Sequence, residues 1–257
     1  QGNFSWKDGV QDKDVVFSPN KQGRWFVSWM PKPEDRNKYT VKGNKKFPAN
    51  DHIGVGGVDS YDLDSTTDNR GSKGACHLYN KFNMAAPANM FVAEYASRPP
   101  LARIFYEDVL MAAVFFGYPL LIENNKYGIV RYFESRGYEE YVMKRPDHLK
   151  SPNAANTKTR GIPSNSVDVI QSHAQAIEAF VEEHVGINSE TGDMGKMYFQ
   201  RTLEDWIGYK IDNRTKYDLT ISSGLALLGA QKTKTKKKES QFNDKQFFRR
   251  YNKEIRR

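Results

Sequence analysis

The sequence predicts an α/β fold built on a mixed sheet. Three consecutive segments at 53–64, 73–82 and 90–97 have the β-branched, aromatic and small apolar residues of strands. Their short connections favour an antiparallel meander. A helix at 101–116 then leads to a short apolar strand at 119–123. A strand reached through a helix usually runs parallel to a neighbour, which makes the predicted sheet mixed.

The first of these strands ends in acidic residues. Ile53–Asp64 reads IGVGGVDSYDLD, with aspartates at 59, 62 and 64. Its glycines leave room for close approach of a backbone or a ligand. An aspartate at the end of a buried strand is costly unless a cation neutralises it. Aspartates are also common in surface turns, so this stretch alone leaves both explanations open.

The remaining elements follow from apolar periodicity and from glycine and proline positions. The segment 146–166 is rich in Pro, Asn, Ser and Thr and predicts irregular structure. Helices are expected at 127–136, 167–184, 201–207 and 218–231, a further strand at 138–144, and a strand tip at 197–199.

The N-terminal residues 1–50 look like a separate small unit. Asp14–Ser18 and Arg24–Met30 are rich in β-branched and aromatic residues and flank a turn, so we expect a β-hairpin extension. Pro31–Asn50 is polar and reads as a linker. The expected division of the chain is 1–50, 51–230 and 231–257.

Charge is concentrated at the C-terminus. Gln231–Arg257 has eleven basic and three acidic residues, which accounts for the whole net charge of +8. Such a tail favours a polyanion such as nucleic acid, although a solvated terminus has the same composition. Lys232, Lys234 and Lys236 are candidate DNA contacts. The single Cys76 excludes an internal disulfide, and no apolar run is long enough to span a membrane.

Three acids occupy related places in the predicted fold. Asp59 ends the first strand, Glu123 ends the strand after the first helix, and Asp218 begins the last helix. Three carboxylates that converge on a cleft can hold two Mg²⁺ or Mn²⁺ ions, which prefer oxygen ligands. Each acid also has an ordinary explanation, because Asp218 could cap its helix and Glu123 could pair with a nearby cation.

Four motifs resemble those of one known family. GVDSYD carries a first-strand aspartate, IENNKYG fits Glu-x-Asn-x-x-Gly, KYDLTISSGLAL is an aspartate before an apolar helix, and TKTRG is a basic segment between the second and third acids. Together they resemble the C-terminal nuclease domain of the large terminase subunit of tailed bacteriophages, over about Ile53–Ala230. One departure is Tyr217, where many members have a second aspartate before Asp218.

The resemblance implies an RNase H-like fold, with helices on both faces of a central mixed sheet. It implies an endonuclease that hydrolyses double-stranded concatemeric viral DNA during genome packaging, with Asp59, Glu123 and Asp218 as ligands of two Mg²⁺ or Mn²⁺ ions. Asp62 and Asp64 are possible additional ligands.

The same resemblance suggests which residues meet DNA. Asn125 would orient the site or touch a phosphate. Lys158 and Arg160 are candidates for gripping the DNA backbone, although a solvated loop would contain them equally well.

The resemblance also implies partners and a location. The chain begins at Gln1 and has no Gly-x-x-x-x-Gly-Lys-Ser/Thr loop, so we expect a nuclease separated from the ATPase domain of a longer protein. The capsid portal and the small terminase subunit would be partners, at the procapsid in the host bacterial cytoplasm. Two alternatives stay open: a junction resolvase or transposase of the same superfold, and a non-catalytic DNA-binding packaging module.

Overall fold

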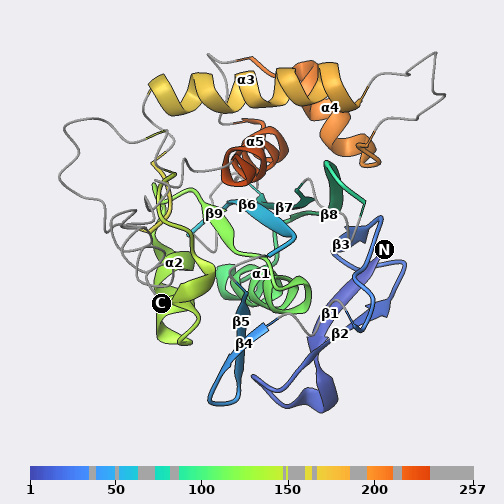
Figure 1. Cartoon of the computed structure of the whole chain (residues 1–257), viewed down its shortest axis with the longest axis vertical. Coiled ribbons are helices and arrows are strands. Elements are labelled where there is room, and N and C mark those ends of the chain that lie inside the picture. The colour runs from blue at the N-terminus through green and yellow to red at the C-terminus, as the bar shows by residue number, and fades with distance from the viewer. Residues whose placement is uncertain are drawn as a thin grey trace, which may run out of the picture.

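Seven strands form one mixed sheet in the computed structural model of the chain (Figure 1). The order across the sheet is β2-β1-β3-β8-β7-β6-β9. The structure describes residues 1–34, 39–49, 52–62, 73–81, 87–146, 149, 160–163, 167–185, 196–210 and 216–231. The strands are β1 (Gly2–Trp6), β2 (Val15–Pro19), β3 (Trp25–Val27), β6 (Gly54–Asp59), β7 (Gly74–Asn80), β8 (Met90–Ser97) and β9 (Leu120–Ile122).

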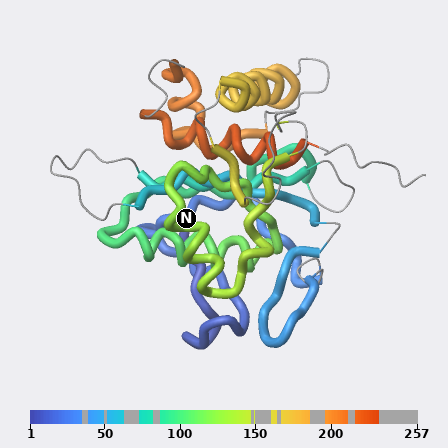
Figure 2. Tube along the Cα trace, turned by 90° about the vertical axis from the view of Figure 1, so that its left-hand side faces the viewer, coloured from blue at the N-terminus to red at the C-terminus, as the bar shows by residue number. Residues whose placement is uncertain are grey.

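The centre of the sheet has the predicted arrangement. Strands β6, β7 and β8 form an antiparallel meander, and β9 pairs in parallel with β6. The helices are α1 (Ala102–Phe116), α2 (Gly128–Ser135), α3 (Val167–His184), α4 (Gln200–Gly208) and α5 (Asp218–Ala230). Helix α1 covers one face, and α5 lies on the other beneath α3 and α4 (Figures 1 and 2). The prediction of helices on both faces is therefore confirmed.

Glycine brings α5 onto the middle of the sheet. A Cβ at Gly57 would lie 2.1 Å from the carbonyl oxygen of Ser222 and 2.2 Å from the amide nitrogen of Ala226. No larger residue fits there, so the α5 backbone rests directly on β6. Side chains alternate along a strand, so Asp59 projects to the same side as Gly57, toward α5.

Helix α3 covers α5 through one apolar stripe. Its buried residues recur at helical spacing, at Val169, His173, Ile177 and Phe180. Its bounds are those predicted. In the described part of the chain, no helix combines the length and apolar character needed to cross a membrane.

An N-terminal hairpin is present, but its strands differ from the predicted ones. Strand β2 pairs with β1, whose residues were not expected to form a strand, and β3 lies between β1 and β8. The predicted pairing of 14–18 with 24–30 is therefore wrong. These three strands continue the central sheet, and the proposed division into units stays a prediction.

Three local predictions are also corrected. The segment expected to be a linker contains a second hairpin, β4 (Tyr39–Lys42) and β5 (Lys45–Pro48). The predicted strand 138–144 is a short 3-10 turn, η3 (Glu139–Tyr141), followed by single bridges at Val142 and Lys144. Residues 197–199 form no strand, because Met197 and Phe199 pack into the core under α3 instead.

Candidate active site

Two of the predicted acids lie side by side at the ends of parallel strands. Val58 is level with Ile122 in the pairing of β6 with β9, and the amide of Glu123 donates to the carbonyl oxygen of Val58 at 2.9 Å. Asp59 and Glu123 therefore leave the sheet together. Their exposed fractions are only 4% and 7%.

The third acid approaches from the helix above. Asp218 begins α5 one turn before Ser222, which sits on Gly57. This register sets the start of α5 over the end of β6. The charge of Asp218 is felt by Asp59, where it contributes to a raised pKa. The fold thus brings Asp59, Glu123 and Asp218 into one neighbourhood.

Asp218 does not cap its own helix. The cap comes from α4, where Asp205 accepts hydrogen bonds from the amide and the hydroxyl of Thr220 at 2.8 and 2.9 Å. Asp218 instead accepts from the amide of Lys73 at 2.9 Å. The simple capping explanation for Asp218 is therefore removed.

The electrostatics of Asp59 and Asp218 are unfavourable without a cation. Burial raises the pKa of Asp59 well above its usual range, and the charge of Glu123 and a hydrogen bond with it raise the pKa further. Burial also raises the pKa of Asp218, against the opposing effects of the Lys73 amide and of the charge of Lys126. A buried acid among acids favours a bound cation, which would restore the ionised forms.

The segment after β9 adds two residues to the site. The amide group of Asn125 donates to Glu123 Oε1 at 2.8 Å, so Asn125 orients this carboxylate. The Lys126 ammonium donates to the carbonyl oxygen of Ser60 at 3.0 Å. Lys126 was not predicted from the sequence as a site residue, although it lies inside the IENNKYG motif. Its signal was a cation three residues after a candidate ligand.

Asp62 has a supporting role. Its Oδ1 accepts from the Tyr106 hydroxyl at 2.8 Å, and its Oδ2 accepts from the amide of Gly128 at 3.2 Å. These bonds hold the start of α2 against the segment that follows β6. Asp64 lies outside the described residues.

The basic residues predicted to contact DNA are only partly described. Arg160 donates from Nη1 to the carbonyl oxygens of Glu139 and Val142, the latter at 3.0 Å. It thereby fixes the outer edge of the sheet. The other basic candidates lie outside the described residues: Lys158, Lys232, Lys234 and Lys236.

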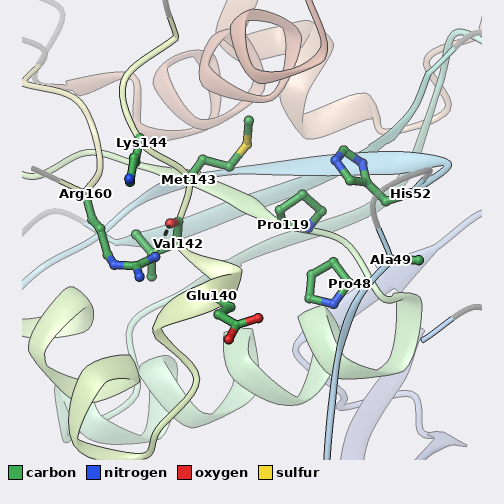
Figure 3. A pocket seen from close by; sticks show the side chains of 9 residues that line it. All are labelled: Pro48, Ala49, His52, Pro119, Glu140, Val142, Met143, Lys144 and Arg160. Carbon is green, nitrogen blue, oxygen red and sulfur yellow. Dashed lines mark hydrogen bonds between the residues drawn. The ribbon is translucent and has the colours of Figure 1, made fainter. Parts of the chain in front are cut away.

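Arg160 also lines a pocket of about 490 Å³ beside the start of β9 (Figure 3). Lys144 lies above Arg160 and Glu140 below it, while His52 faces them across the pocket. The three candidate acids are absent from its lining, which is Pro48, Ala49, His52, Pro119, Glu140, Val142, Met143, Lys144 and Arg160. The pocket is therefore separate from the acidic site.

A buried polar cluster supports the start of α5. The ring of His77 contacts Ser222 Oγ at 2.8 Å and Thr202 Oγ1 at 2.7 Å. Ser222 Oγ donates in turn to the carbonyl oxygen of Asp218 at 3.0 Å. His77, Ser222 and Thr202 are fully buried, so this serine and histidine are inaccessible to a substrate. Their role is to fix the turn that carries Asp218.

The donor set fits a hard divalent cation, because it consists of carboxylate oxygens. As the side chains stand, no three His, Cys, Asp or Glu residues among those described converge closely enough to hold a metal ion. The Asp218 carboxylate is bound by the Lys73 amide at 2.9 Å.

Comparison with known proteins identifies the fold. No protein family matches the sequence, and no curated protein is similar to it. Among solved structures, the nuclease domain of the large terminase of Thermus phage P74-26 matches with a TM-score of 0.50 and 10% sequence identity. The match covers 80% of this chain and 86% of that domain. The chain therefore has the RNase H-like fold of the terminase nuclease domain that its motifs resemble.

Proposed function

We propose that the chain is a metal-dependent endonuclease that cuts double-stranded DNA during viral genome packaging. The observation that supports this proposal is that Asp59 and Glu123 lie side by side at the ends of β6 and β9, with Asp218 nearby at the start of α5. Strongly perturbed buried acids gather at functional sites more often than elsewhere. The likeness to a terminase nuclease domain supports the choice of DNA as substrate.

In this proposal Asp59, Glu123 and Asp218 hold two Mg²⁺ or Mn²⁺ ions. Bound there, the ions would supply an activated water and would stabilise negative charge on the phosphodiester. The protein's own contribution is positional. Asn125 holds the Glu123 carboxylate, and the close packing of α5 on β6 at Gly57 sets Asp218 over the end of that strand.

DNA would be gripped by basic residues around the site. Lys158 and Arg160, together with Lys232, Lys234 and Lys236 of the tail, are the proposed contacts to the DNA backbone. The proposed partners are the terminase ATPase domain of a longer chain, the capsid portal and the small terminase subunit. The proposed place of action is the procapsid in the host cytoplasm.

The test is nicking of supercoiled plasmid in Mn²⁺. The parent is expected to nick and linearise the plasmid, and Asp59→Asn and Glu123→Gln to lose this activity. Glu182→Gln, an exposed acid of α3, is the matched control and should cut like the parent. If Asp59→Asn and Glu123→Gln cut as fast as the parent, the site assignment is wrong.

Two comparisons address the alternatives. Faster cutting of a four-way junction than of a linear duplex would favour a resolvase. DNA binding without metal and without any cutting would favour a non-catalytic packaging module, and deletion of the residues after Gln231 would then abolish it.

A further inference from the structure

Lys126 lies where the segment after β9 folds back onto the segment after β6. Its ammonium donates to the carbonyl oxygen of Ser60, the residue that follows Asp59, at 3.0 Å. Within the described part of the chain, this is the one hydrogen bond that the ammonium makes, and it has no ion pair there. A lysine ammonium has three donor hydrogens, so two are left for a ligand.

The position of this cation links it to the candidate ligands. Lys126 lies three residues after Glu123, and its ammonium is bound to the carbonyl oxygen of the residue that follows Asp59. It is therefore anchored between the segments that carry these two acids. The side chain is partly buried, and neighbouring Asn125 already contacts Glu123.

Four half-buried arginines among the described residues are committed to structure. Arg24 is bound by Asp108, Arg136 by Glu107 and Asp12, and Arg201 by Glu94. Arg160 donates to backbone carbonyl oxygens. Lys126 differs from all of these, because it combines a fixed position at the acidic site with unused donors.

We propose that Lys126 is a catalytic residue that donates to a non-bridging oxygen of the scissile phosphodiester. This proposal rests on the nuclease function proposed above. A fixed ammonium at that oxygen stabilises the negative charge that develops as the phosphorus is attacked. The Ser60 carbonyl oxygen holds the ammonium in place before the substrate arrives, so little reorganisation is needed.

The experiment compares Lys126→Gln and Lys126→Arg with the parent, and uses Lys7→Gln at the opposite edge of the sheet as the control. Cleavage of a linear duplex is timed in Mn²⁺. Binding of the same duplex is measured by fluorescence anisotropy at several salt concentrations, with Ca²⁺ in place of Mn²⁺ so that the duplex stays intact. Thermal melting of each variant verifies that it is folded.

Lys126→Gln is expected to cut on the order of 100-fold more slowly, as for loss of one donor to a developing oxyanion. Its binding should depend less steeply on salt, with a slope lower by about 0.9, the amount expected for one lost phosphate contact. Lys126→Arg should keep the parent slope and recover part of the rate. The control should match the parent in both measurements.

Three results would overturn the proposal for Lys126. The first is cutting by Lys126→Gln at the parent rate. The second is slower cutting with an unchanged salt slope, which would make the residue merely structural. The third is a lower slope with full activity, which would make it a binding contact outside the reaction. A parent protein that cuts no DNA would overturn the proposed nuclease function, and this inference with it.

Discussion

Asp108 and Asp59 are equally buried, at 4% exposure each, yet their surroundings are opposite. Asp108, on α1 beneath the sheet, accepts from Arg24 Nε at 2.6 Å, from Arg24 Nη2 at 2.8 Å and from the Tyr95 hydroxyl at 3.0 Å. Asp59, on the α5 side, faces Glu123 and Asp218. Asp108 is neutralised by an arginine of the fold, whereas Asp59 lies among other acids, with the charge of Lys126 as the opposing effect.

The comparison distinguishes an acid held by an ion pair from the acid proposed to be functional. A buried acid with a bidentate arginine has its charge satisfied, so its loss costs stability. A buried acid among like charges is unfavourable for folding, and its retention requires another reason. Burial alone would not have distinguished Asp108 from Asp59.

The largest expected effect is on stability, from paired substitutions at these two acids. Asp108→Asn should lower the free energy of unfolding by about 3 kcal/mol, the lower end for a broken buried pair, because the Arg24 side chain is 35% exposed. Asp59→Asn should leave it unchanged or raise it in metal-free buffer, because a repelled charge is removed. Urea titrations measure both, and a larger loss for Asp59→Asn would contradict the comparison.

A second effect on the free energy of unfolding should appear at low pH. Burial alone would raise the pKa of Glu94, but the nearby His77 ring, a hydrogen bond from Thr202 and the charge of Arg201 lower it to about 2 from 4.5. A lowered folded-state pKa contributes stability above the unfolded value, and this stability is lost as the pH falls from 4.5 toward 2. The shift corresponds to about 3 kcal/mol.

Glu94→Gln tests this pH dependence. Its unfolding free energy should change less than that of the parent as the pH falls through this range. Parallel curves for the two proteins would show that Glu94 contributes nothing to acid sensitivity. Asp59 has the opposite sign, because its raised pKa makes the ionised form a cost to the folded state.

The smallest expected effect on stability is at the start of α5, where Asp205 and Asp218 both lie near the helix N-terminus. Asp205→Ala should destabilise the protein by about 1 kcal/mol, because Thr220 loses its cap. Asp218→Ala should cost less, because the one hydrogen bond that its carboxylate accepts from the described residues comes from the Lys73 amide. Thermal melting ranks the two variants, and the reverse order would return the capping role to Asp218.

The sequence predicted the centre of the fold because the relevant signals are local. The strands at β6, β7 and β8, the parallel β9 and the stripe of α3 all follow from periodicity and connection type. The strand pairing at the N-terminal edge of the sheet could not be predicted from such local signals. Strand β3 pairs with β8 through Trp25 and Tyr95, 70 positions apart, and this contact displaces the hairpin that proximity favoured.

The candidate site shows the same limit. The order of the motifs along the sequence predicted Asp59, Glu123 and Asp218 as metal ligands, and these roles stay a prediction. The capping role of Asp205 depends on how α4 packs beside α5, and the place of Lys126 depends on a contact with Ser60, 66 positions earlier. Asp62 was predicted only as a possible additional ligand, but its carboxylate also accepts from the amide of Gly128, at the start of α2. These roles come from tertiary contacts that no sequence spacing encodes.

The most direct test is the anomalous diffraction of a crystal soaked in Mn²⁺. We expect anomalous density between the carboxylates of Asp59, Glu123 and Asp218, with Asp218 turned away from the Lys73 amide to reach it. This density should disappear in Asp59→Asn. Mn²⁺ density elsewhere in the molecule, with none between these three acids, would contradict the account.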